Sequence, residues 1–88
     1  MPVYVIIDHR GSLKSRIEEK FNTSDVCKVG NQVSFVRSTY LTAAEVSKSL
    51  EIKASDQVFG IVARVTRYSG AAERAIVQKL SAWDEESG

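Results

Sequence analysis

The sequence predicts an α+β domain with a four-stranded antiparallel sheet, two helices on one face of the sheet and a further helix at the C-terminus. Two observations predict it. Strand-like and helix-like patterns follow the order strand, helix, strand, strand, helix, strand, helix, and only a short glycine-containing connection separates the second and third strands. The 88 residues suffice for one modest hydrophobic core, so we expect a single domain over residues 1–83.

The spacing of apolar residues predicts the first strand and the first helix. Val3–Ile7 is an unbroken apolar run that ends on the carboxylate of Asp8, which is typical of a buried strand. Over Leu13–Phe21 apolar residues recur at steps of four between charged ones, which indicates one apolar stripe on a solvated helix. We expect Ser12 or Ser15 to cap that helix.

The middle of the chain is predicted to form a hairpin and a second helix. Residues 30–31 separate two strand-like runs, 26–29 and 32–38, as in a hairpin with a two-residue turn. The segment Thr42–Glu45 has the spacing of a capping box, in which the threonine hydroxyl accepts from a free amide and the glutamate reaches back. We expect a short helix from there to Leu50.

The remainder of the chain should add a strand, a helix and a tail. Residues 58–66 form the longest β-rich run and are expected to be a central or long strand. A last amphipathic helix is predicted over 72–83, and residues 84–88, of which the first three are acidic, are expected to form a flexible tail. Two strand–helix–strand units joined by a hairpin give the ferredoxin-like βαββαβ arrangement, in which the sequence does not fix the position of the last helix.

Strand parity predicts that the sheet has a second apolar face. If the odd-numbered residues of Phe59–Val65 face the two helices, the even-numbered ones face the other way. The apolar residues assigned to that other face are Tyr4, Ile6, Val36, Val58 and Val62. Large exposed apolar areas usually mark interfaces. We therefore predict that a second copy of the chain covers this face, with the last helix assisting at its rim.

Composition limits the class of protein. The net charge is +1, but residues 1–83 carry all 12 basic residues and eight of the 11 acidic ones, so the body is mildly basic and permits nucleic-acid contact without requiring it. No apolar run is long enough for a membrane-spanning helix and no signal peptide is recognisable, so we expect a cytoplasmic protein without membrane contact. The lone Cys27 agrees with a reducing compartment and is expected to be a packed apolar residue.

Asp8 is the leading candidate site residue, because a buried strand delivers this acid to a sheet edge just before a helix. Mg²⁺ prefers hard oxygen ligands, and two copies of Asp8 in a dimer could hold it together with a substrate phosphate. The simpler interpretation is a strand-end acid that accepts hydrogen bonds from the next loop or pairs with Arg10. No other cofactor is expected.

Five further residues are candidate binding groups, and each has a structural alternative. The histidine among them could act as an acid or base or be an ordinary surface residue, and the arginines could contact a nucleic-acid backbone or simply end their strands. These candidates are His9, Arg10, Arg64, Arg67 and Tyr68. No nucleophilic triad, zinc-type cluster or phosphate-loop pattern is present in the sequence.

Three segments of the chain resemble a known group of proteins. The opening Val3–Asp8, the segment Ser38–Val46 and the stretch Val65–Gly70 are similar to the small SinR-family proteins. That family is similar in fold to the small CRISPR-associated nuclease subunit of the spacer-integration complex and to VapD-type toxins. The resemblance implies a homodimer of prokaryotic or mobile-element origin. In the nuclease relatives it implies a metal-binding acid at the end of the first strand, the position that Asp8 occupies.

These observations leave three functions open. The first is a small homodimeric interaction module without catalytic activity, with a protein or nucleic-acid partner meeting the strand-end loops. The second is a magnesium-dependent endoribonuclease that uses Asp8. The third is nucleic-acid binding without cleavage. The absence of a recognisable catalytic set in the sequence favours the first.

Overall fold

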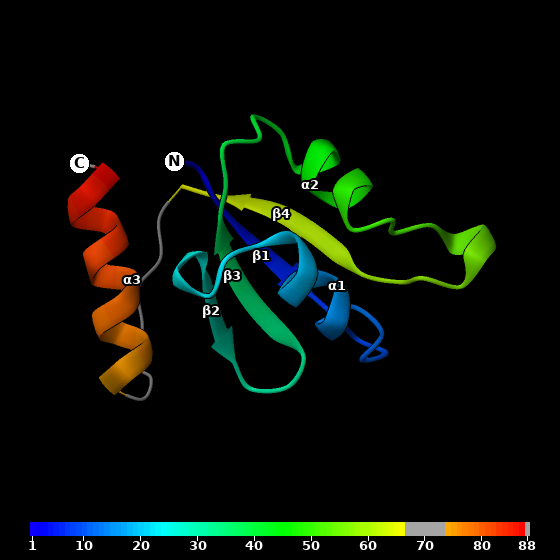
Figure 1. The fold of residues 1–88 in the computed structure, drawn as a ribbon, viewed down its shortest axis with the longest axis horizontal. Helices are drawn as coiled ribbons and strands as arrows, with labels where there is room; N and C mark the ends of the chain where they lie inside the picture. The colour runs from blue at the N-terminus through cyan, green and yellow to red at the C-terminus, as the bar shows by residue number, and fades with distance from the viewer. Residues whose placement is uncertain (67–73, 88) are drawn as a thin grey trace.

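The computed structural model describes residues 1–66 and 74–87, and within these ranges the chain is an α+β unit (Figure 1). The last two predicted-site residues, Arg67 and Tyr68, lie outside the described residues. The elements in chain order are β1 Val3–Ile7, α1 Lys14–Lys20, a 3-10 turn Thr23–Asp25, β2 Val26–Val29, β3 Val33–Arg37, α2 Ala43–Ser49, a 3-10 turn Ala54–Asp56, β4 Ile61–Val65 and α3 Arg74–Ser87.

The four strands form one antiparallel sheet in the order β2-β3-β1-β4. The central strand β1 pairs with β3 on one side and with β4 on the other, and Tyr4 lies opposite Val36 and Arg64. The edge strands are therefore β2 and β4. The predicted four-stranded antiparallel sheet is confirmed.

The main hydrophobic core lies between the sheet and the helices α1 and α2. Its buried side chains from the sheet side and from the helices are Tyr4, Ile6, Val36, Val58, Leu13, Ile17, Val46 and Leu50, and Val62 packs against them. The Tyr4 hydroxyl donates a hydrogen bond to the Tyr40 carbonyl at 2.7 Å, which satisfies the one polar atom of this buried ring.

The predicted parity of the sheet is wrong. The residues assigned to a dimer interface, Tyr4, Ile6, Val36, Val58 and Val62, all pack in the core under α1 and α2 of their own chain. The odd-numbered residues of β4 face the opposite way. The physical reason is that β1 and β4 are apolar on both faces, so alternation alone cannot tell which set meets the helices.

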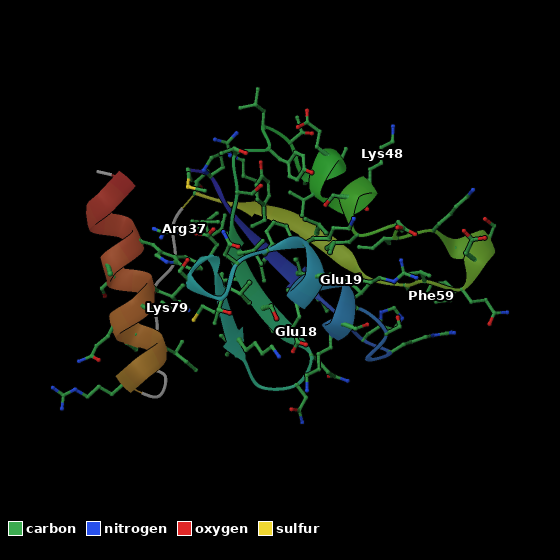
Figure 2. All side chains as sticks on the ribbon, in the orientation of Figure 1. Glu18, Glu19, Arg37, Lys48, Phe59 and Lys79 are labelled. Carbon is green, nitrogen blue, oxygen red and sulfur yellow. The ribbon has the colours of Figure 1, made fainter. Side chains whose placement is uncertain are left out.

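Helix α3 covers part of the second face of the sheet. Trp83 is buried with Val3 and Cys27 in a second cluster, against which Phe35, Val65, Ile76 and Leu80 pack. Two polar contacts reinforce the docking: the Arg37 guanidinium lies 5.4 Å from the centre of the Trp83 ring, and the Lys79 ammonium donates to the Thr23 carbonyl at 2.9 Å (Figure 2). The helix continues to Ser87, beyond the predicted end at Trp83.

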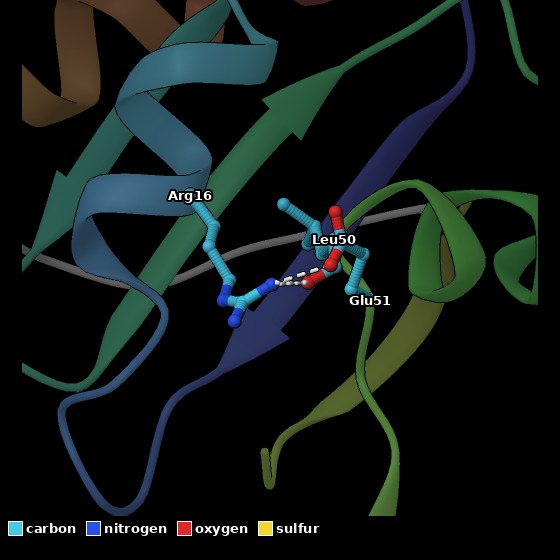
Figure 3. A network of polar contacts seen from close by, with 3 residues as sticks. All are labelled: Arg16, Leu50 and Glu51. Carbon is cyan, nitrogen blue, oxygen red and sulfur yellow. Dashed lines mark hydrogen bonds and ion pairs between the residues drawn. The ribbon is translucent and has the colours of Figure 1, made fainter. Parts of the chain in front are cut away.

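Hydrogen bonds link helix α1 to the C-terminal end of helix α2 on the first face of the sheet. The Arg16 guanidinium of α1 donates to the carbonyl of Leu50 at 3.4 Å and to the Glu51 carboxylate at 3.2 Å, just after α2 ends (Figure 3). Glu51 has a φ of 58°, a left-handed conformation that ends the helix. At the start of α2, Thr42 accepts from the Glu45 amide at 3.1 Å, which confirms the predicted cap.

Two local predictions need correction. Neither Ser12 nor Ser15 caps α1. Leu13 occupies the N-cap position, and its side chain makes no capping hydrogen bond. The last strand is a five-residue edge strand, Ile61–Val65, and not a long or central one. Gly60 precedes it, at a position where a Cβ would clash with the Leu13 side chain and closely approach the Ile7 carbonyl, so a residue without a side chain fits there.

Removal of Trp83 should release α3 from the sheet. We expect Trp83→Ala to lower the free energy of unfolding by about 3 kcal/mol, because a large buried aromatic ring is lost. Burial raises the pKa of the Cys27 thiol, and α3 lies over that thiol. The rate of Cys27 modification by a disulfide reagent at neutral pH should therefore rise several-fold in the variant.

Val77→Ala is the matched control for this measurement, because Val77 lies on the same helix but is exposed. It should leave both quantities unchanged. Equal thiol reactivity in wild type and Trp83→Ala would show that α3 does not protect this face.

Candidate functional site

The Asp8 side chain points into the interior of the protein. Asp8 is 4% exposed, directly after β1 and on the same face as Tyr4 and Ile6. Its Oδ2 accepts a hydrogen bond from the backbone amide of Leu13 at 3.1 Å, where α1 begins. Its amide donates to the Gln32 carbonyl at 2.7 Å, so the residue joins β1 to the hairpin loop as well.

The second carboxylate oxygen of Asp8 has no partner among the described residues. Oδ1 is buried and makes no hydrogen bond with any of them. A buried charged acceptor without a donor is unfavourable, and native structures normally satisfy such groups. Two structural roles were predicted for Asp8: accepting a hydrogen bond from the following loop, or pairing with Arg10. The structure shows the hydrogen bond from the loop. The pairing with Arg10 is absent.

A polar pocket of about 360 Å³ adjoins Asp8, between the first turns of α1 and the β2–β3 hairpin. Asp8 and Ser34 are its buried polar residues, and Ile17 is its buried apolar one. The full lining is Asp8, Gly11, Lys14, Ile17, Lys28, Gly30, Asn31, Gln32 and Ser34. The hairpin loop spans 30–32, because Val29 pairs with Val33 and Gly30 has a φ of 75°, so the turn is one residue longer than predicted.

The charged side chains of this pocket are two lysines and Asp8. The Lys28 ammonium donates to Glu18 Oε1 at 3.0 Å, and this hydrogen bond and the lysine charge lower the pKa of the Glu18 carboxyl. One N–H bond occupies only one of the three donors of a lysine. Lys14 and the remaining donors of Lys28 can therefore bind an acceptor placed in the pocket.

The other candidates after β1 lie apart from this carboxylate. His9 and Arg10 are exposed, and both contact Phe59. The Arg10 guanidinium lies 4.1 Å from the centre of the Phe59 ring, and the His9 ring lies 6.0 Å from it. In Figure 2 Phe59 lies at the end of the molecule remote from α3. The exposed His9 and Arg10 form a cluster with the half-buried Phe59. Sequence patterns did not predict this cluster, since Phe59 is distant in sequence.

Arg64, the remaining candidate among the described residues, does not join Asp8. Arg64 is exposed on β4, opposite Tyr4 in the register. Among the described residues no group of three or more histidine, cysteine, aspartate or glutamate side chains could hold a metal ion. Asp8 is therefore the single acid of its pocket, and its role in metal binding stays a prediction.

A second candidate site lies on the other face of the sheet, beyond the reach of α3. One row of aliphatic side chains crosses all four strands there, and the register pairs its members in the order Val29, Val33, Ile7 and Ile61. We call these four residues the exposed row. Ile61 is 59% exposed and Ile7 is 37% exposed, while the two valines are half-buried. Ala63, in the next row, is also exposed.

Comparisons with known proteins add no family. No family model matches the chain, and neither the curated proteins nor the solved structures contain a match. In the described residues no helix has the length and apolar character that crossing a bilayer requires. The resemblance to SinR-family proteins remains a prediction, and the function has to be inferred from the two sites themselves.

The hydrogen bond from Leu13 makes a specific prediction for Asp8. Asp8→Ala removes the acceptor and should lower the free energy of unfolding by about 1 kcal/mol or more. Asp8→Asn keeps a carbonyl oxygen for the Leu13 amide and removes the unpartnered charge, so it should unfold at a urea concentration close to that of wild type. Equal destabilisation by both substitutions would mean that the buried charge itself supports the fold.

Proposed function

We propose that this protein is a small ferredoxin-like interaction module that forms a homodimer through the edge of β4 and the exposed row beside it. The sheet order β2-β3-β1-β4, with α1 after β1 and α2 after β3, supports the ferredoxin-like assignment, because two β–α–β units joined by a hairpin give this order. The observation that carries the proposal is an apolar surface that α3 leaves uncovered, next to a strand edge with no partner among the described residues.

The edge of β4 has few of the features that prevent pairing. Edge strands expose a row of backbone donors and acceptors, and natural proteins commonly protect them with proline, lysine or a bulge. Ile61–Val65 contains no proline and no lysine, and its pairing with β1 is regular along its whole length. Its one charged side chain is Arg64. A second strand can therefore add to this edge by backbone hydrogen bonds.

A second copy of β4 suits this edge better than an arbitrary strand. In an antiparallel pair related by a two-fold axis through Ala63, Ile61 lies opposite Val65 and Val62 lies opposite Arg64. Like charges do not meet in this register, and the apolar residues of one face meet one another. The exposed row of each copy then becomes part of one longer apolar surface, because Ile61 belongs both to the row and to the edge strand.

The nuclease alternative receives less support from the geometry. One Asp8 oxygen already accepts from Leu13, and the other is buried inside a single copy of the chain. Two such carboxylates cannot share an ion while each stays buried inside its own copy. The loop 9–12 is exposed and is available to meet a further protein or nucleic-acid partner of the dimer.

Substitution of the exposed row should separate the two copies. We expect wild type to be a dimer by light scattering coupled to size exclusion at micromolar concentration. Ile61→Glu places a charge opposite the apolar side chain of Val65 of the second copy and should raise the dimer dissociation constant at least tenfold, which corresponds to about 1.4 kcal/mol. The circular dichroism spectrum should stay unchanged, since Ile61 is exposed in the single chain.

Leu41→Glu is the matched control, because Leu41 is 70% exposed and lies outside the sheet. It should leave the mass unchanged. A monomeric wild type, or loss of the dimer in the control alone, would contradict the proposed surface. Cleavage of a mixed RNA pool that depends on magnesium and is abolished by Asp8→Asn would contradict the assignment as a non-catalytic module.

A further inference from the structure

The pocket beside Asp8 has the composition of a ligand site. Among the described residues the buried polar or charged side chains are Asp8, Ser34 and Ser38, and the first two line this pocket. Asp8 Oδ1 is buried and unpartnered. Polar groups are buried at a cost in free energy unless a donor or acceptor meets them, and within residues 1–66 and 74–87 no donor meets Oδ1.

The charged groups of the pocket indicate the kind of ligand that would bind there. At the buried end a carboxylate oxygen lacks a hydrogen-bond donor. Elsewhere in the lining Lys14 and Lys28 provide ammonium donors, and only one of those donors is bound to Glu18. A ligand that fits both conditions carries a hydroxyl at one end and an anionic group at the other. A metal cation would meet one acid and two positive charges, which is an unfavourable set.

We propose that this pocket binds a small hydroxylated organic phosphate, with a hydroxyl donating to Asp8 Oδ1 and the phosphate accepting from Lys14 and Lys28. The volume of about 360 Å³ lies in the range of small-molecule sites. Lysine is a common phosphate ligand in proteins, and hydrogen bonds to charged groups are stronger than neutral ones. The pocket lies on the helix side of the sheet, so this proposal is independent of the dimer at the exposed row.

Access to Asp8 involves the loop 9–12. All four residues of this loop are exposed, and at Gly11, which lines the pocket, an added Cβ would meet open space. Because Oδ1 is shielded, the hydroxyl reaches it by displacing part of this loop. Binding should therefore alter the backbone amides of residues 8–13 as well as those of the hairpin loop 30–32.

The test is a titration of the full chain with ribose 5-phosphate, followed by ¹H–¹⁵N correlation spectra. We expect saturable shifts in residues 8–13 and 30–34 with ribose 5-phosphate, weaker shifts with inorganic phosphate and none with ribose. Asp8→Asn should weaken the binding of ribose 5-phosphate roughly tenfold or more, because the acceptor for the hydroxyl is replaced by an amide nitrogen or lost. It should leave the weak binding of inorganic phosphate unchanged.

Lys14→Gln tests the proposed contact with the phosphate group, and Lys48→Gln is its matched control. Lys48 is exposed on α2 and does not line the pocket, so its substitution should leave the affinity unchanged, while Lys14→Gln should weaken both phosphates. The proposal is overturned if ribose 5-phosphate gives no saturable shift at millimolar concentration. It is also overturned if inorganic phosphate binds as tightly as ribose 5-phosphate, or if Lys14→Gln and Lys48→Gln bind alike.

Discussion

The structure depends on one constraint: the sheet is apolar on both faces, and each face needs cover. On the first face α1 and α2 provide it, and the core there includes fully buried residues of the two central strands, Tyr4, Ile6 and Val36. On the second face α3 is the cover, and it is anchored by Trp83 over the start of β1. Because α3 is a single helix across a four-stranded sheet, the exposed row at the other end of the strands stays open to solvent in one copy.

This asymmetry links the fold to the proposed function. The part of the second face that α3 leaves open is also the part that adjoins the edge of β4, where Ile61 belongs to both. In the proposed dimer, pairing of the two β4 edges satisfies backbone groups of that strand and also brings Ile61 beside an apolar residue of the second copy. The pocket beside Asp8 lies on the opposite side of the sheet, so one chain can present two sites without competition between them.

The order of the elements was predictable from the sequence, but the facing of the sheet was not. Apolar spacing at steps of four and the Thr42–Glu45 capping box located both short helices, because each signal is local. Which face of the sheet meets the helices depends on whether the odd-numbered or the even-numbered residues point toward them. Val3–Ile7 and Ile61–Val65 carry apolar residues in both sets, so the sequence pattern does not decide between them. The need for glycine at position 60, just before the last strand, depends on Leu13, with which a side chain there would clash, and Leu13 is distant in the sequence.

The candidate site was predictable in part. The sequence pattern predicts a strand-end acid at Asp8, and a hydrogen bond from the following loop is one of its two simpler interpretations. Asp8 is buried with one unpartnered oxygen because of the face of β1 on which it lies and the course of the loop that follows it. No local sequence pattern predicts either feature. The sequence pattern does not distinguish Lys14 from the other lysines of a solvated helix. Its role in the pocket depends on the hairpin that lies beside it in the structure.

The most direct test of the central claim is hydrogen–deuterium exchange of the segment 61–65 as a function of protein concentration. The account predicts that these amides exchange more slowly as concentration rises, because a second copy of β4 supplies partners to the open edge, while the amides of the central strand β1 do not change. Exchange of residues 61–65 that is independent of concentration, up to the solubility limit of the protein, would contradict it.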